Sequence, residues 1–295
     1  MKDVLKEKIG QTVLKVFGLK KSLKIYYKLK TGMKLDLDNP TSYSEKIQYR
    51  KLNYKDNPLY VVCADKYVVR EYVKEKIGEK YLIPLYFAKS SITKEDIESL
   101  PNSFVLKTNN ASKTNIIVSD KSKHNIKEIV NKMNKYVKYK FGYRTFELFY
   151  NDIKPLIIAE KYLGTKDGLV PNDYKFFSFK QSNNTSKILI QVDQGRYTDS
   201  HYRAYFDEKW NLEPYGNEMG EYNHKFEKPK KLNEMLKLVK KLAEDFDFVR
   251  VDLYEVDNKI YFGELTFTDG SGYDILEPRS YDKLWGTYWR WIWKK

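Results

Sequence analysis

Two carboxylates interrupt an otherwise apolar pair of predicted strands in FVRVDLYEVDNKIYFGELTFTDGSG, residues 248–272. Asp252 stands inside the first strand and Glu264 inside the second. A carboxylate in a half-buried strand costs several kcal/mol unless another group compensates its charge. We therefore expect both side chains to be paired.

The length of the turn decides whether these carboxylates meet. A two-residue turn at Asp257–Asn258 places Asp252 opposite Gly263 and turns Glu264 to the other face, because side chains alternate along a strand. A three-residue turn or a bulge places Asp252 directly opposite Glu264. Two facing carboxylates need a cation between them, so we predict one of these two arrangements.

Hard carboxylate oxygens are the ligands that magnesium prefers when it bridges substrate phosphates. Thr266 follows Glu264 by two residues and shares its face. The sequence therefore suggests a magnesium site at Asp252, Glu264 and Thr266. An acidic pair on a solvated sheet face is the alternative.

A second candidate lies in FVLKTNNASKTNIIV, residues 104–118. A strand delivers Lys107 into a loop of small and polar residues, and another strand leaves the loop. Backbone N–H groups in such loops can enclose a phosphate chain. The loop contains no glycine, and an exposed lysine at a strand end is the alternative.

A third candidate is IIAEKYL, residues 157–163, where a hydrophobic strand ends in Glu160 and Lys161. The backbone at a strand edge can bind the amine and a ring nitrogen of adenine, and Glu160 can accept from ribose hydroxyls. An ordinary strand end with a salt-bridging pair is the alternative.

The elements that must position these residues alternate between helices and strands, with hairpins as frequent as crossovers, which is typical of an α+β fold with two lobes. Helices are predicted at 64–77, 93–100, 121–141 and 229–246, and strands at 79–88, 154–163, 173–180 and 187–196, beside the two strand pairs at 101–120 and 248–272. Thr93 and Asp96 form a capping pattern for the second helix. Gly and Pro cluster at 159–173, where we place the lobe boundary.

Both ends of the chain are basic and amphipathic. Residues 1–30 predict a helix or helix pair, either packed on the domain or in contact with an anionic membrane. The C-terminal WGTYWRWIWKK, residues 285–295, places tryptophans on one helical face. That stripe either packs in the core or lies at a membrane interface.

Composition narrows the class of protein. The 295 residues include 54 Lys and Arg against 40 Asp and Glu, a net charge of +14 that attracts polyanions. The single cysteine, Cys63, forbids an internal disulfide and favours a reducing cytoplasm. The three histidines are too scattered for a zinc site, and we expect neither a membrane span nor a secretion signal.

In their order along residues 60–280, these segments resemble the TupA-like ATP-grasp family, which is associated with bacterial cell-surface polysaccharide and teichuronopeptide synthesis. The matching segments are ADKY, FVLKTNN followed by NIIV, IIAEKYL, DYKFF, IQVD, FVRVDLY and YFGELTFTDGSG. The EKYL segment is also similar to that of biotin carboxylase.

The resemblance implies an α+β ATP-grasp fold, in which two α/β lobes grip ATP between antiparallel sheets, with an N-terminal basic helical segment. We accordingly expect an extension at 1–50, a first part with the phosphate lid at 51–160, and a C-terminal lobe with the metal site and Trp-rich tail at 161–295.

The resemblance also implies roles for individual residues. The nucleotide would be bound by Lys66, Lys107, Asn109, Ser112, Lys113, Glu160, Lys161, Leu163 and Lys175, with residues 109–115 as the lid. Asp252 and Glu264 would hold two magnesium ions together with Thr266, and Glu264 would bridge them. The lid departs from the family's glycine-rich pattern at ASKT, and Thr266 stands where many ATP-grasp enzymes carry asparagine.

The implied activity is an ATP- and magnesium-dependent carboxylate–amine ligase that works through an acylphosphate. Lys107, Arg196 and Arg250 would act in catalysis, and the turn at Gly270, Ser271 and Gly272 would offer N–H groups to the substrate. The acceptor would be a uronic-acid carboxyl of an acidic surface glycan, such as a capsule, or of its precursor. An amino acid or another amine would be the second substrate.

Three alternatives remain from the sequence: an ATP-dependent phosphotransferase on the same fold, a polysaccharide glycosyltransferase, and a non-catalytic polyanion-binding protein. We expect no nucleic acid partner. We expect a cytoplasmic protein, with peripheral contact to anionic membrane or to polysaccharide-assembly proteins at the inner face of the membrane as an open question.

Overall fold

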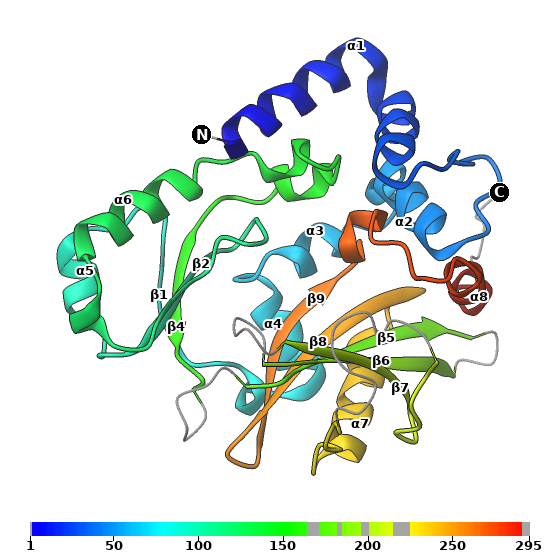
Figure 1. Cartoon of the computed structure of the whole chain (residues 1–295). Coiled ribbons are helices and arrows are strands. Elements are labelled where there is room, and N and C mark those ends of the chain that lie inside the picture. The colour runs from blue at the N-terminus through cyan, green and yellow to red at the C-terminus, as the bar shows by residue number, and fades with distance from the viewer. Residues whose placement is uncertain (1, 165–170, 182–184, 196–200, 215–224, 291–295) are drawn as a thin grey trace. The chain divides into compact units, whose positions relative to one another are not determined.

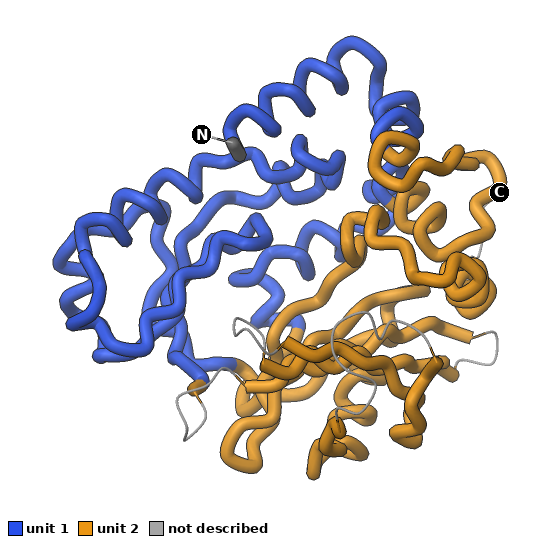
Figure 2. The backbone as a smooth tube through the Cα atoms, viewed as in Figure 1, with its two compact units in different colours: residues 1–26, 51–72, 83–163 blue, residues 27–50, 73–82, 164–295 orange. Residues whose placement is uncertain are grey.

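A computed structural model describes residues 2–164, 171–181, 185–195, 201–214 and 225–290 (Figure 1). The chain divides into two compact units, each assembled from three separate segments (Figure 2). Unit 1 comprises residues 1–26, 51–72 and 83–163, and unit 2 comprises 27–50, 73–82 and 164–295. The domain boundaries predicted from the sequence, after residues 50 and 160, stay predictions.

The elements confirm the α+β class. The helices are α1 (Lys2–Thr31), α2 (Tyr43–Leu52), α3 (Leu59–Ala64), α4 (Val69–Ile77), α5 (Lys94–Glu98), α6 (Ile126–Tyr136), α7 (Leu232–Ala243) and α8 (Ser280–Tyr288). The strands are β1 (Leu85–Lys89), β2 (Phe104–Thr108), β3 (Ile116–Val118), β4 (Ile157–Lys161), β5 (Asp173–Lys180), β6 (Ser186–Gln194), β7 (Tyr202–Asp207), β8 (Phe248–Val256) and β9 (Lys259–Thr266).

Local side-chain hydrogen bonds explain where several helices begin and end. The predicted capping box is present, because Thr93 Oγ1 accepts from the Asp96 N–H and Asp96 accepts from the Thr93 N–H. The single helix predicted at 64–77 is wrong. Asp65 accepts from the N–H groups of Tyr67 and Val68, and this local turn separates α3 from α4.

In unit 1, four antiparallel strands form a sheet in the order β1–β4–β2–β3. One face of this sheet packs against α6, where Phe104 and Leu106 of β2 meet Ile129 and Met133 of the helix. All four of these side chains are buried. The opposite face of β2 carries Lys107, as strand alternation requires.

In unit 2, five antiparallel strands form a sheet in the order β7–β6–β5–β8–β9. Helix α7 packs against β5 and β8. Strand β7 was not predicted from the sequence, although it supplies one edge of this sheet. The register pairs Lys175 with Gln191 on one side and with Asp252 on the other.

The hairpin of β8 and β9 confirms the bulge prediction. Its turn is the two residues Asp257–Asn258, both with positive φ (48° and 60°), as a hairpin turn matched to strand twist requires. The register then shifts, so that Asp252 lies opposite Glu264 and Gly263 becomes the extra residue. A Cβ atom at Gly263 would lie 2.9 Å from the Tyr254 ring, so a larger residue there would force the ring to shift.

The two tryptophans at the start of the C-terminal segment belong to the core. Trp285 and Trp289 are buried beside Tyr43, Phe177 and Phe248 in an aromatic cluster of unit 2. The core-packing interpretation is therefore confirmed for these two residues. Trp293 lies outside the described residues.

Helix α1 is a helix pair rather than one straight helix, because Gly18 interrupts it with φ 68° and ψ 169°. Within the described ranges, no helix combines the length and the apolar character that crossing a bilayer requires.

We predict different effects for two buried tyrosines of unit 2. The Tyr27 hydroxyl lies 2.8 Å from Ser44 Oγ, whereas the Tyr43 hydroxyl has no hydrogen-bond partner in the described part of the chain. Tyr27→Phe should lower the free energy of unfolding by about 1 kcal/mol, and Tyr43→Phe should leave it unchanged or raise it. Denaturant unfolding of both variants measures the difference, and a larger loss in Tyr43→Phe would contradict the assignment.

Candidate functional site

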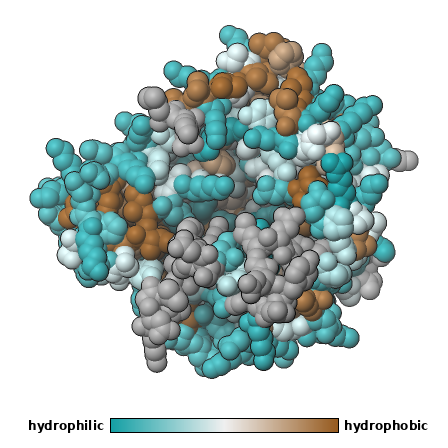
Figure 3. All heavy atoms as spheres, viewed as in Figure 1, coloured by the Kyte–Doolittle hydropathy of each residue, from teal (hydrophilic) through white to brown (hydrophobic). Residues whose placement is uncertain are grey.

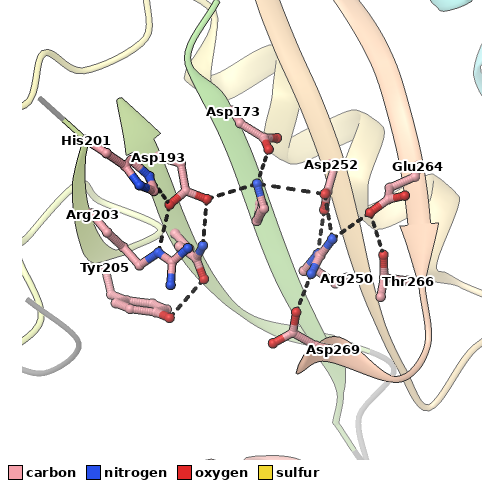
Figure 4. A network of polar contacts seen from close by, with 12 residues as sticks. Asp173, Asp193, His201, Arg203, Tyr205, Arg250, Asp252, Glu264, Thr266 and Asp269 are labelled. Carbon is pink, nitrogen blue, oxygen red and sulfur yellow. Dashed lines mark hydrogen bonds and ion pairs between the residues drawn. The ribbon is translucent and has the colours of Figure 1, made fainter. Parts of the chain in front are cut away.

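One face of the unit 2 sheet carries a continuous network of charged side chains (Figure 4). The strand register aligns a polar row across all five strands, in the order Tyr205, Gln191, Lys175, Asp252, Glu264. Beside this row, the register places Asp173 opposite Asp193 and Asp193 opposite Arg203. Side chains from five strands therefore meet on one surface.

Arg250 supplies the cation between the two facing carboxylates. Its Nε and Nη2 donate to the two oxygens of Asp252 at 2.7 Å each, and Nη2 also donates to Glu264 Oε1 at 2.7 Å. Its Nη1 donates to Asp269, which follows β9. All three guanidinium nitrogens are thus committed, and the expected pairing of the carboxylates is met within the same hairpin.

Lys175 connects the hairpin to the rest of the network. Its Nζ contacts Asp173, lies 3.1 Å from Asp193 Oδ2, and lies 4.0 Å from Asp252 Oδ2. Burial lowers the pKa of Lys175, but Asp173 and Asp252 outweigh burial and raise it above its usual value. Lys175 therefore keeps its charge in this buried position.

Asp193 is the hub of the network, and the sequence did not single it out. Its Oδ1 accepts from Arg203 Nε at 2.7 Å and lies 3.0 Å from His201 Nε2. Its Oδ2 accepts from Gln191 Nε2 at 2.9 Å and contacts Lys175. Although burial raises its pKa, Lys175 and Arg203 together hold the pKa of Asp193 well below the usual range.

Among the described residues of this network, five carboxylates face three lysine and arginine cations. The carboxylates are Asp173, Asp193, Asp252, Glu264 and Asp269, and the cations are Lys175, Arg203 and Arg250. Two negative charges are left over if every carboxylate ionises. Burial raises the pKa of Asp252 against the opposing effects of Arg250 and Lys175, and the neighbouring carboxylates Asp173 and Glu264 add to the rise.

The donor set has the oxygens that magnesium prefers, but Arg250 already donates to both oxygens of Asp252 and to Oε1 of Glu264, so the ion would share these oxygens with the guanidinium. Asp252 and Glu264 offer hard oxygens on one face, and Thr266 Oγ1 lies 3.1 Å from Glu264 Oε1. In the part of the chain that the structure describes, no group of three or more His, Cys, Asp or Glu is arranged to hold a metal. Phosphate and water oxygens would therefore have to complete the coordination, as is usual for magnesium.

The turn expected to bind substrate lies directly after β9. Gly270, Ser271 and Gly272 all have positive φ, at 53°, 54° and 64°. Gln48 Nε2 holds the turn by donating to the carbonyls of Ser271 and Gly272 at 2.9 Å each. The Ser271 N–H donates to the Thr268 carbonyl, so it is already committed.

In unit 1, two motifs that are separate in sequence come together. Lys107 Nζ lies 2.7 Å from Glu160 Oε2, and Arg70 Nη1 lies 3.7 Å from Glu160 Oε1. Glu160 is buried in the middle of the sheet, whereas Lys161 is exposed at the end of β4. The half-buried Leu163 follows the strand.

The loop between β2 and β3 has a fixed base and an exposed tip. Asn109 donates from Nδ2 to Asp65 and to the Lys154 carbonyl, and its Oδ1 accepts from the Leu156 N–H at 2.7 Å. Its amide therefore serves the structure of the loop. Ser112 and Lys113 are exposed, and Lys113 has a φ of 60°.

Two further predicted residues have different outcomes. Lys66 reaches this loop from the segment after α3, since its Nζ donates to the Ala111 carbonyl at 2.8 Å. Arg196 lies outside the described residues.

Arg203, which sequence reasoning missed, joins the network from β7. The available signal was the alternation in HYRAYFD, residues 201–207, which places His201, Arg203 and Tyr205 on one face of a strand.

A family model described as TupA-like ATPgrasp matches residues 45–290. No curated protein matches the chain.

Several solved structures are similar at low identity. D-alanine–D-alanine ligase from Helicobacter pylori has a TM-score of 0.47 at 15% identity, covering 85% of this chain and 69% of that chain. L-amino acid ligase from Bacillus licheniformis has a TM-score of 0.49 at 14% identity, covering 79% and 50%. D-alanine–D-alanine ligase from Bacillus anthracis, complexed with ATP, has a TM-score of 0.39 at 14% identity, covering 70% and 54%. The chain thus spans about half to two-thirds of the lengths of these proteins.

The network predicts a stability effect that magnesium reverses. Arg250→Met removes the guanidinium shared by Asp252, Glu264 and Asp269, and should lower the free energy of unfolding by about 3–5 kcal/mol. Millimolar MgCl₂ should restore part of this loss, because the freed carboxylates need a cation. Thermal unfolding with and without MgCl₂ measures both effects.

The control is Arg50→Met, which removes another buried arginine of unit 2. Arg50 donates to Asp247 and to the carbonyls of Phe248 and Phe267, away from the carboxylate pair. We expect a destabilisation that magnesium does not relieve. Equal recovery of both variants would show that the ion acts elsewhere.

Proposed function

Because the chain belongs to the TupA-like ATP-grasp family, we propose that it is an ATP- and magnesium-dependent ligase that joins a carboxylate to an amine. The family match supports this function together with the predicted ATP-grasp fold. The observation that carries the proposal in the chain itself is the buried network around Asp252, Glu264, Lys175 and Arg250.

The network suits phosphoryl transfer because that reaction needs positioning and charge neutralisation more than covalent help from the protein. Lys175 carries a buried positive charge beside the carboxylate pair, and Lys107 carries another in unit 1. When bound at Asp252 and Glu264, magnesium would neutralise phosphate oxygens. We propose that two ions bind, as the family resemblance implies.

The proposed reaction has two steps. A substrate carboxylate oxygen attacks the γ-phosphorus of ATP, the bond to the bridging oxygen breaks, and ADP leaves. An amine nitrogen then attacks the acyl carbon, loses a proton, and displaces inorganic phosphate to form an amide. Lys175 stabilises negative charge in unit 2, Arg250 acts through the carboxylates that it holds in place, and the turn at residues 270–272 orients the acyl group.

For the substrates, we propose a uronic-acid carboxyl of a bacterial surface polysaccharide or its precursor, and an amino acid or another amine. The net charge of +14 suits an acidic glycan. The likeness of the chain to a family associated with surface polysaccharides supports the same choice. The use of ATP and the single cysteine favour the cytoplasm as the place of reaction.

We predict that ATP with magnesium raises the melting temperature of the wild type, since a ligand that binds only the folded state stabilises it. Glu264→Gln should reduce the shift by removing a metal-binding oxygen. Glu255→Gln is the matched control, because it neutralises a carboxylate on the same hairpin but on the opposite face. An unchanged shift in Glu264→Gln would argue against the metal site.

Product analysis then separates the ligase from its alternatives. Repeated turnover of ATP to ADP should require both a uronic acid and an amine, and hydroxylamine in place of the natural amine should trap the acylphosphate. A stable phosphorylated sugar formed without an amine would identify a phosphotransferase instead.

A further inference from the structure

Arg203 is the arginine of the network whose guanidinium is only partly used. Its Nε donates to Asp193 Oδ1 at 2.7 Å, and neither Nη atom has a hydrogen-bond partner among residues that the structure describes. Its side chain is 33% exposed, against 10% for Arg250, whose three nitrogens all bind carboxylates. Arg203 therefore presents two N–H-bearing nitrogens to a ligand.

The position of this guanidinium is fixed before any ligand arrives. Asp193 is almost fully buried and is itself held by Lys175 and by Gln191, which accepts in turn from the Tyr205 hydroxyl at 2.8 Å. A planar guanidinium that is held at Nε and free at both Nη atoms matches the two oxygens of a carboxylate or phosphate. Preorganisation of this kind reduces the entropy that binding costs.

The place of Arg203 in the sheet sets its distance from Asp252 and Glu264. The strand order β7–β6–β5–β8–β9 puts Arg203 at one edge and Glu264 at the other. At a strand spacing of about 4.8 Å, the backbones of β7 and β8 are about 14 Å apart. Lys175 on β5 lies between the proposed magnesium ligands and Arg203.

We infer that Arg203 anchors an anionic oxygen pair at the β6–β7 side of the network, and that in the proposed reaction this pair is the carboxylate of the acidic acceptor. The inference rests on the proposed function for the identity of the acceptor. Asp193 is then a positioning residue that aims Arg203 and Lys175. A phosphate of ATP is the other source of the same oxygen chemistry.

The test measures the affinities of three probes by calorimetry: a non-hydrolysable ATP analogue with magnesium, D-glucuronate, and D-glucose as the neutral control. Glucuronate should bind the wild type in the presence of the nucleotide, and glucose should not. Arg203→Ala should weaken glucuronate about 10- to 100-fold and leave the nucleotide affinity unchanged. Arg203→Lys keeps the charge next to Asp193 but loses the forked guanidinium, so its affinity for glucuronate should lie between those of the wild type and Arg203→Ala.

The outcomes show whether the anion at Arg203 is the carboxylate of the acceptor or a phosphate of ATP. Loss of nucleotide affinity in Arg203→Ala, with glucuronate unaffected, would assign the anchor to a phosphate of ATP. Wild-type affinities for both ligands in Arg203→Ala would overturn the inference and leave the proposed function standing. If the wild type binds no nucleotide, the proposed function fails. Glucuronate and inorganic phosphate alone then decide the role of Arg203, and the inference is overturned if neither of them binds. Arg279→Ala, at an exposed arginine of unit 2, is the charge control.

A separate observation concerns the first arm of α1. Leu5, Ile9 and Val16 lie at helical spacing and are 60%, 46% and 66% exposed. Exposed lysines, among them Lys6, Lys8 and Lys15, accompany them along the same arm. Figure 3 shows hydrophobic atoms at the surface at the top of the view, where Figure 1 places α1.

The opposite side of this arm is packed. A Cβ atom at Gly10 would lie 2.0 Å from the Tyr143 carbonyl oxygen, and Glu7 accepts from the Lys140 N–H at 3.2 Å. One side of the arm thus packs against unit 1, and the apolar stripe on the other side is exposed. An apolar stripe accompanied by lysines is complementary to an anionic bilayer surface, which accepts the apolar side chains and attracts the charges.

We also propose that this stripe docks the protein on an anionic membrane. The wild type should co-sediment with phosphatidylcholine vesicles that contain phosphatidylglycerol, and not with pure phosphatidylcholine vesicles. Leu5→Ser combined with Ile9→Ser and Val16→Ser should abolish binding, whereas Leu212→Ser, at an exposed leucine of unit 2, should retain it. Vesicle binding that is equal in the triple variant, or absent in the wild type, would contradict membrane docking and leave a protein partner for the stripe.

Discussion

A buried charge must be compensated, and this constraint governs the sheet of unit 2. Each carboxylate of the network lies beside a cation: Asp193 beside Lys175 and Arg203, and Asp252 and Glu264 beside Arg250. Removing these charged groups from water costs free energy that the attraction between them does not always recover. The network is therefore a poor way to stabilise the fold. In the proposed function the network is a surface kept charged for a highly charged ligand, and its excess of carboxylates would be balanced by a divalent cation.

The rest of unit 2 keeps this surface in register. The bulge at Gly263 aligns Glu264 with Asp252, and the aromatic cluster around Trp285 and Trp289 packs on Phe177 and Phe248 in the same strands. Because a strand that slips by one residue turns all its side chains to the other face, these apolar contacts also fix which charges meet. Packing and electrostatics are therefore coupled through the strand register.

The proposed chemistry divides between residues with different freedom. Arg250 is bound by three carboxylates and Asn109 by its loop, so both are set by the fold. Arg203 and the tip residues Ser112 and Lys113 have exposed polar groups that a ligand can engage. Sites commonly combine rigid supporting residues with a few accessible groups, because preorganised groups lose little entropy on binding.

The sequence by itself determined the α+β class and the resemblance to the ATP-grasp family, because both depend on local patterns and on the order of motifs. It also predicted that Asp252 faces Glu264 through a bulge or a three-residue turn, and the structure has the bulge. It did not identify β7, the hub Asp193, the pairing of Lys107 with Glu160, or Arg250 as the cation between the carboxylates. The turn after Asp65 was also missed, because a helical pattern hides a local side-chain cap. Tertiary structure decided these points, since strand pairing joins residues far apart in the chain, and the partner that compensates a buried charge depends on which strands lie side by side.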